Sequence, residues 1–227
     1  MNREVIVLIP PSEGKQPGGN KPPLRKVSKE NQPLIDHLNK IAPADWSKWL
    51  GVKGKVLEQA VQANRTILTA KTLAAIERYT GVVYSAIDYV SLSPKGKDFF
   101  NRHVRIVSAL FGLVKPDQLI PDYKWPMEKG GFDKHWRSII TQKLKDAYVI
   151  DLLPQAHKKA VQYEHGISVD FCLMKDGKNK PAGHSGKHIK GRFVRFLCEN
   201  QIVSEKEFPR FKESGFKYSG NRFIKQM

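Results

Sequence analysis

The sequence contains little cysteine and no long apolar run. Its two cysteines, Cys172 and Cys198, both have apolar neighbours in a chain of 227 residues. We interpret them as small buried thiols, as expected in a reducing cytoplasm, and keep a redox-sensing pair as the alternative. No segment has the length and hydrophobicity of a transmembrane helix, and the N-terminus enters a strand-like run at once. We therefore expect a cytoplasmic protein without a signal peptide or membrane anchor.

Acidic residues are scarce relative to basic ones. The chain has 39 Lys and Arg against 22 Asp and Glu, which gives a formal net charge of +17. Such an excess raises the local concentration of polyanions around the protein. Nucleic acid is the partner that we expect. An anionic membrane surface and a basic surface that only confers solubility are the alternatives.

The sequence also lacks a convincing set of metal ligands. His184 and His188 are four residues apart and could share a helix face, but Gly183, Ser185 and Gly186 disfavour a continuous helix there. No cluster of carboxylates and histidines accompanies them. We expect no metal site and no cofactor.

Hydrophobic periodicity predicts the fold class. The continuous apolar residues 5–9 predict a strand that is covered on both faces. Residues 10–33 are rich in proline and glycine and should form a long irregular loop. Helical spacing alternates with further predicted strands near 104–108, 149–153, 168–174, 217–218 and 222–224. The prediction is one α+β (α/β) domain over residues 1–227, with a small mixed β-sheet surrounded by helices.

Residues 104–116 contain the most informative motif. Val104 and Ile106 alternate in a predicted strand, after which Ser108, Gly112 and Pro116 follow at intervals of four. A small residue, a glycine and a Lys-Pro pair after a strand indicate a strand that ends at a functional site. A buried strand followed by an ordinary loop is the alternative.

Several motifs resemble those of one known family, in the same order. Residues 108–116 (Ser-Ala-Leu-Phe-Gly-Leu-Val-Lys-Pro) are similar to a Ser-Gly-Leu-Tyr-Gly-Leu-Leu-Arg-Pro signature. Residues 8–15 (Leu-Ile-Pro-Pro-Ser-Glu-Gly-Lys) are similar to a Leu-Pro-Pro-Ser-Glu-x-Lys opening, and 79–84, 149–152 and 187–191 match further segments. By these motifs the chain resembles the peroxide stress protein YaaA family from residue 5 to about residue 218.

The resemblance implies the YaaA fold with a helix-hairpin-helix-like element, DNA binding, and a role in the response to hydrogen peroxide. The family's association with free iron implies no metal site here, because the sequence shows no iron ligand set. Residues 151–157 lack the acidic and tyrosyl members of the family's Asn-Leu-Ala-Ser-x-Glu-Tyr segment, and residues 124–127 lack a carboxylate. The resemblance therefore implies no catalytic role at these positions.

Basic residues at motif and helix positions are the candidates for phosphate binding. Residues 50–55 (Leu-Gly-Val-Lys-Gly-Lys) stand between two helical stretches. They loosely resemble a helix-hairpin-helix turn, whose glycines let backbone N–H groups reach a DNA phosphate, and an ordinary turn is the alternative. In the predicted helix near residue 190, Lys187 and Lys190 are three residues apart, as are Arg192 and Arg195, so each pair lies on one side of the helix. This basic face either binds phosphate or is solvated. The full set is Lys15, Lys53, Lys55, Lys115, Lys187, Lys190, Arg192 and Arg195.

Strand ends and glycines provide the candidates for a cleft. Gly191 has no side chain and weakens its helix, which suggests that something approaches the backbone there. We expect residues 11–12, 80–81, 108–112 and 187–191 to meet, because loops at strand ends form the binding sites of α/β folds. No Ser-His-Asp set can be identified from the sequence, so catalytic residues remain unknown. The predicted cleft residues are Pro11, Ser12, Thr80, Gly81, Tyr84, Ser108, Gly112 and Gly191.

Two hypotheses follow. The first is a cytoplasmic DNA-binding protein of the YaaA type, which binds duplex or structured DNA through phosphate contacts with weak sequence preference. The second is an enzyme that acts on a nucleobase or nucleotide in a basic cleft. An enclosed pocket formed by Lys15, Tyr84, Ser108 and Lys187 would favour the enzyme, and a shallow basic groove would favour the DNA-binding protein.

Overall fold

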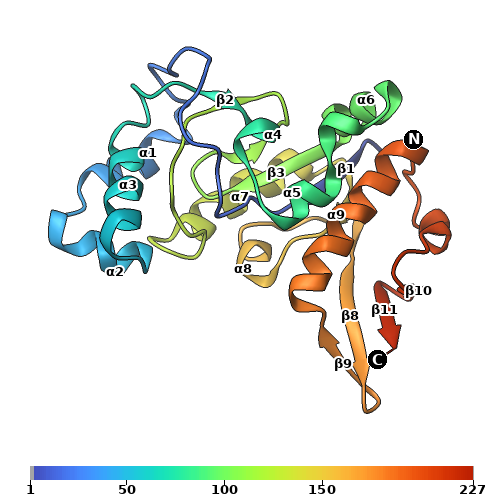
Figure 1. The fold of residues 1–227 in the computed structure, drawn as a ribbon. Coiled ribbons are helices and arrows are strands. Elements are labelled where there is room, and N and C mark those ends of the chain that lie inside the picture. Colours follow the sequence, from blue (N-terminus) through green and yellow to red (C-terminus); the bar gives the residue numbers. More distant parts are fainter. Residues whose placement is uncertain (1–2, 227) are drawn as a thin grey trace.

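A computed structural model describes residues 3–226 (Figure 1). Its central sheet has the strand order β4–β3–β1–β6–β7, and β1 pairs in parallel with both β3 and β6. β7 continues the parallel arrangement, whereas β4 folds back antiparallel to β3. The strands are β1 (Val5–Ile9), β3 (Val104–Ser108), β4 (Gly112–Val114), β6 (Tyr148–Asp151) and β7 (Gly166–Ser168).

A second sheet lies beside the first and has the order β10–β11–β8–β9. It contains β8 (Asp170–Lys175), β9 (Lys178–Pro181), β10 (Lys217–Ser219) and β11 (Arg222–Gln226). Figure 1 shows the β8–β9 hairpin projecting from the body as an arm. A two-stranded sheet pairs β2 (Leu73–Ala74) with β5 (Leu119–Ile120). The predicted α+β class is confirmed, but three sheets replace the single sheet that we expected.

Helices separate the strands as the periodicity predicted. Pro43 separates the first two α-helices, since α1 ends before a 3-10 turn that begins at that residue. The α-helices among residues 3–226 are α1 (Gln32–Asn39), α2 (Trp46–Leu50), α3 (Gly54–Arg65), α4 (Ala75–Arg78), α5 (Val82–Ile87), α6 (Pro94–His103), α7 (Phe132–Leu144), α8 (Gln155–Lys158) and α9 (Gly183–Asn200). 3-10 turns are formed by Pro43–Asp45, Tyr89–Ser91 and Glu205–Arg210. In the described part of the chain, no helix is both long and apolar enough to cross a membrane.

The core is centred on β1, whose five residues are all buried. Burial of consecutive residues requires cover on both faces of the sheet. Both cysteines are buried and free, which confirms the prediction of buried thiols. Burial raises the pKa of Cys198 far above that of an exposed thiol, so this sulfur is held in its neutral form.

Residues 10–31 form the expected irregular loop, and the body of the protein holds it at several points. Lys15 and Lys21 form isolated β-bridges with Tyr79 and Thr72. Arg78 is fully buried and donates to the carbonyl oxygen of Gln16. The loop is therefore anchored at its middle, which fixes Lys15 relative to the sheet.

Helix α9 begins earlier than the sequence indicated. We expected the glycines near residue 184 to interrupt it, but it runs from Gly183 to Asn200 and includes both His184 and His188. Gly186 is tolerated because α9 packs closely on β8: a Cβ there would lie 3.7 Å from the Cβ of Phe171. The prediction of a broken helix was wrong because tertiary packing overrides the low helix propensity of glycine.

Candidate functional site

The carboxyl ends of four parallel strands meet at one edge of the central sheet. β1 is followed by Pro10, Pro11 and Ser12, while β3 ends at Ser108 and β6 ends at Asp151. The chain turns to opposite sides of β1 to form β3 and β6, so the order of the strands reverses at β1. Ligands of open α/β sheets bind outside the carboxyl ends of the strands at such a reversal. This edge is therefore where a site should form.

A closed tyrosine network occupies the β3 side of this edge. Ser108 and Tyr123 share a hydrogen bond of 2.7 Å between their hydroxyls, and the hydroxyls of Tyr123 and Tyr79 are 3.1 Å apart. The backbone N–H of Phe111 donates to the Ser108 hydroxyl over 2.9 Å. Burial raises the pKa of both tyrosines, which keeps them neutral. Ser108 is fully buried, so the network holds the strand end in place.

Lys15 covers this network. Its ammonium group lies 4.6 Å from the ring centroid of Tyr123 and 5.5 Å from that of Tyr79, and it donates to the carbonyl oxygen of Ser12 over 3.2 Å. Burial lowers the pKa of Lys15 to about 8. The amine is therefore held between two aromatic rings, where a cation is stabilised by their π-faces.

A second polar cluster occupies the β6 side. One carboxylate oxygen of Asp151 accepts from the N–H of Leu153 over 2.8 Å, and the other accepts from the Tyr163 hydroxyl over 3.3 Å. Burial raises the pKa of Asp151, against the opposing effect of Lys158 and Lys190. The Asp151 carboxylate thus supplies negative charge beneath two lysines.

Lys190 and Lys158 face this region from different helices. The ammonium group of Lys190 donates to the carbonyl oxygen of Leu152, and burial lowers its pKa to about 8. Lys158 contacts the Ser168 hydroxyl over 2.6 Å and the Asp170 carboxylate over 3.4 Å. Both amines are thereby fixed at the ends of β6 and β7.

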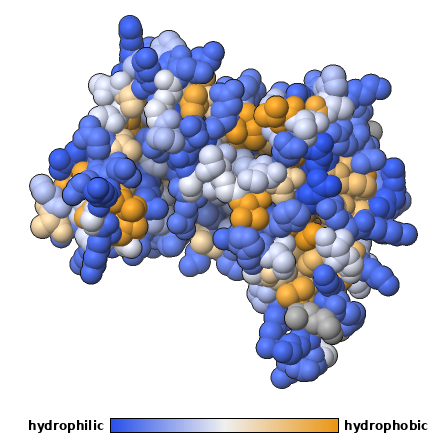
Figure 2. Space-filling view, viewed as in Figure 1, coloured by the Kyte–Doolittle hydropathy of each residue, from blue (hydrophilic) through white to orange (hydrophobic). Residues whose placement is uncertain are grey.

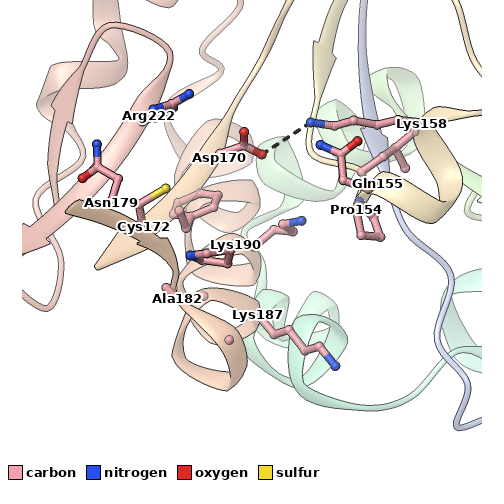
Figure 3. Close-up of a pocket in the computed structure, with 15 residues that line it drawn as sticks. Pro154, Gln155, Lys158, Asp170, Cys172, Asn179, Ala182, Lys187, Lys190 and Arg222 are labelled. Carbon is pink, nitrogen blue, oxygen red and sulfur yellow. Dashed lines mark hydrogen bonds and ion pairs between the residues drawn. The ribbon is translucent and has the colours of Figure 1, made fainter. Parts of the chain in front are cut away.

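These lysines border a cavity of about 490 Å³. Figure 3 shows it between α8, the β8–β9 hairpin and the first turns of α9. Its basic lining residues are Lys158, Lys187, Lys190 and Arg222, and its one carboxylate is Asp170. The volume is typical of sites for small molecules.

Two of the four predicted cleft segments, residues 11–12 and 80–81, contact each other. The Tyr84 hydroxyl donates to the carbonyl oxygen of Pro10 over 2.9 Å. A Cβ at Gly81 would lie 3.0 Å from the Ser12 hydroxyl, and a Cβ at Gly14 would lie 2.8 Å from that of Thr80. The loop after β1 is therefore packed on the start of α5, while Pro11 and Ser12 stay half-buried.

The glycines of the predicted cleft face protein atoms. A Cβ at Gly191 would lie 2.3 Å from the carbonyl oxygen of Val83 and 2.7 Å from the Cβ of Ala86. A Cβ at Gly112 would lie 2.6 Å from the Trp136 ring. The close approach that we inferred at Gly191 is real, but the approaching group is helix α5, because α9 crosses it at this point.

Two arginines of the predicted basic face make internal contacts. The Nε of Arg192 is 2.7 Å from the Glu213 carboxylate. Arg195 donates to the carbonyl oxygens of Ile87 and Asp88, each over 3.0 Å, at the C-terminus of α5. Their role in phosphate binding stays a prediction, but these contacts show that both side chains also connect α9 to neighbouring segments. Lys187 and Lys190, in contrast, line the cavity.

Lys115 lies apart from the other candidates. β4 runs antiparallel to β3, and Val114 pairs with Ile106, so the chain has turned back toward the start of β3 when it reaches Lys115. This short strand was not predicted, because residues 112–114 were taken as part of the segment that follows the strand at 104–108. Lys115 is exposed at the opposite side of the sheet from the carboxyl ends.

The segments that depart from the family pattern are ordered. The backbone N–H of Lys124 donates to the Asn64 side-chain oxygen over 2.9 Å, and the Asn64 amide donates to the carbonyl oxygen of Lys124 over 2.8 Å. Burial lowers the pKa of His157 to about 4, so its imidazole is neutral.

His184 and His188 share helix α9, and residues 3–226 contain no group of three or more His, Cys, Asp or Glu side chains that could hold a metal ion.

Sequence reasoning missed several polar residues of this edge, among them Lys158, Tyr163, Asp170 and Arg222. Asp170 was missed because residues 168–174 were predicted as one strand, whereas β7 ends at Ser168 and β8 begins at Asp170 in a different sheet. Lys158, Tyr163 and Arg222 do not directly follow a predicted strand, so no local signal marked them.

Comparison with known proteins agrees with the motif resemblance. The family model described as peroxide stress protein YaaA matches residues 5–222. A UPF0246 protein of Corynebacterium glutamicum (strain R) is 31% identical over 222 residues, covering 89% of this chain and 87% of the relative. A UPF0246 protein of Corynebacterium efficiens is 32% identical, with 86% and 85% covered, and one of Streptomyces coelicolor is 29% identical, with 88% and 85% covered. The chain therefore belongs to the YaaA (UPF0246) family of peroxide stress proteins.

Proposed function

We propose that this protein binds DNA during the response to peroxide, through phosphate contacts centred on the turn between α2 and α3. The family supports the role in peroxide stress. The observation that carries DNA binding is the geometry of that turn, together with the net charge of +17. We call residues 51–55 the α2–α3 corner.

The α2–α3 corner presents open backbone at the start of a helix. Gly51 and Gly54 have φ angles of 66° and 58°, and a Cβ on either would meet no atom within 4 Å. α3 runs for 12 residues from Gly54, and the first N–H groups of a helix have no partner within it. These groups can donate to a phosphate oxygen, which the positive end of the helix dipole also favours.

Two lysines add charge to the α2–α3 corner. Lys53 and Lys55 are exposed, and neither takes part in an ion pair among residues 3–226. Figure 2 shows a mainly hydrophilic face that is hollowed between this end of the molecule and the arm formed by β8 and β9. Phosphate contacts on such a face bind DNA with little dependence on base sequence.

The test is a salt series of duplex DNA binding with the double variant Lys53→Ala/Lys55→Ala. The logarithm of the binding constant should fall with the logarithm of salt concentration by about 0.9 per phosphate contact, so loss of two contacts should reduce the slope by roughly 1.8. The control is Lys95→Ala/Lys206→Ala, which removes the same charge at exposed positions on α6 and after α9, at the far end of the molecule (Figure 1). Absence of binding at low salt, or equal losses in the two variants, would contradict the proposal.

The second candidate is an enzyme that acts on a nucleobase or nucleotide, and the cavity beside α9 favours it. Of the four residues whose convergence would indicate an enzyme, only Lys187 lines this cavity, whereas Lys15, Tyr84 and Ser108 lie outside its lining. A chromatographic screen for conversion of nucleosides and nucleotides tests this candidate. Turnover that Lys187→Ala abolishes would favour the enzyme over the DNA-binding protein.

A further inference from the structure

We propose that the cavity between α8, β8 and the start of α9 binds a small phosphate monoester with an organic body, such as a nucleoside monophosphate or a sugar phosphate. This site is separate from the α2–α3 corner and does not rest on DNA binding. Three features of the cavity support this ligand: unbalanced charge, free backbone donors, and an apolar wall of suitable size.

The charge of the cavity is unbalanced. Its lining contains four basic side chains and one carboxylate, Asp170, which Lys158 already contacts at 3.4 Å. Lys187 and Arg222 are exposed and form no ion pair in the described part of the chain. Like charges gathered around one space repel one another, and a bound anion removes that cost.

The basic groups come from three different elements. Lys158 belongs to α8, Lys187 and Lys190 belong to α9, and Arg222 belongs to β11, and all four line the cavity. Figure 3 shows the Lys187 side chain extending away from Arg222. Lys190 is fixed by its bond to the carbonyl oxygen of Leu152, which leaves its other two N–H groups free to donate to a ligand. Groups that converge from separate elements suit a compact multivalent anion such as phosphate.

The start of α9 adds backbone donors. This helix has 18 residues and is preceded by Ala182, which has no side chain that could cap the first N–H groups. Gly183 and Gly186 line the cavity, and a Cβ at Gly183 would meet no atom within 4 Å. The first turn of α9 therefore borders the same space as the lysines, and its unpaired N–H groups favour an anion there.

The remaining wall suits an organic group. Leu153, Pro154, Phe171 and Pro181 contribute apolar surface to the lining. A cavity of about 490 Å³ is much larger than an inorganic phosphate ion needs and lies within the range of sites for small organic ligands. The combination of a cationic end and an apolar wall indicates a phosphate attached to a sugar or nucleoside.

The experiment is isothermal titration calorimetry with the full chain. The probes are adenosine 5′-monophosphate, glucose 6-phosphate, adenosine, glucose and inorganic phosphate. We expect saturable binding of at least one phosphate ester. Its affinity should be at least tenfold higher than that of the corresponding adenosine or glucose, and at least tenfold higher than that of inorganic phosphate. The ester that binds with the higher affinity shows whether the organic group is a nucleoside or a sugar.

Two variants locate the binding. Lys187→Ala should weaken binding of the ester by about tenfold or more, because the substitution removes a charged donor to the phosphate. Lys180→Ala is the matched control, since this exposed residue sits on β9 between two lining residues but does not itself line the cavity. Thermal denaturation verifies that both variants fold. No saturable binding at millimolar ester, equal affinity for adenosine and its monophosphate, or equal losses in the two variants would overturn the proposal.

Discussion

The contact between α5 and α9 at Gly191 gives a test in which two physical effects have opposite signs. Glycine inside a helix costs about 1 kcal/mol relative to alanine, so propensity alone predicts that Gly191→Ala stabilises the protein. In the structure, however, the added Cβ would lie 2.3 Å from the Val83 carbonyl oxygen, well inside the 3.0 Å that real Cβ atoms keep. The obstacle is backbone, which cannot rotate away as a flexible side chain can.

The expected magnitude follows from the packing. Relieving the contact requires α5 and α9 to separate by about 0.7 Å, the difference between these two distances. Insertion of one methyl group into a well-packed interface costs about 1–3 kcal/mol, and more where the backbone must move. Because the obstacle here is backbone, the upper end of that range, about 3 kcal/mol, applies. After the gain of about 1 kcal/mol from helix propensity, a net loss of about 2 kcal/mol is expected, or a melting temperature lower by roughly 4–8 °C for a chain of this size.

The assay is thermal and urea denaturation of Gly191→Ala beside Gly186→Ala on the same helix. At Gly186 a Cβ would lie 3.0 Å from the Ala182 side chain, so a smaller adjustment suffices and the change should be close to neutral. A variant Gly191→Ala that is as stable as the native protein would refute the packing argument. If that variant also lost DNA affinity, the glycine would serve a ligand, as the sequence first suggested.

The remaining predictions concern two half-buried cations. Arg195→Ala should lower the free energy of unfolding by about 2–4 kcal/mol, measured by urea denaturation, because the carbonyl oxygens of Ile87 and Asp88 lose a charged donor; DNA affinity should stay nearly unchanged, and the opposite pattern would assign Arg195 to DNA. The folded-state pKa of Lys15, about 8, is below its unfolded value of 10.5, so its contribution to stability is lost as pH falls through 8 and is fully present above 10.5. The melting temperature of the native protein should therefore rise relative to that of Lys15→Met between pH 8 and pH 10.5, and an unchanged difference across this range would show that the amine is not desolvated.

The sequence predicted the elements whose local signals are strong. The apolar runs at Val5–Ile9 and Val104–Ser108 have the structure's own strand bounds, and the loop after β1 is irregular as its prolines and glycines indicated. The short strands β4, β7 and β9 were missed. β9, Lys178–Pro181, is exposed throughout and begins with three polar residues, so only its pairing with β8 makes it a strand.

The motifs also identified the family and the ends of β1 and β3 at the sheet edge, since residues that end parallel strands must meet there. Their individual roles required the tertiary structure. The four basic residues 187, 190, 192 and 195 have similar charges and regular spacing, yet the structure places two beside a cavity and gives two internal partners. Helical periodicity determines which residues share a face but not what lies opposite, because that depends on segments a hundred residues away, such as α5 beside Arg195. Charge and periodicity are local properties of the chain, whereas desolvation and pairing arise only when distant segments pack together.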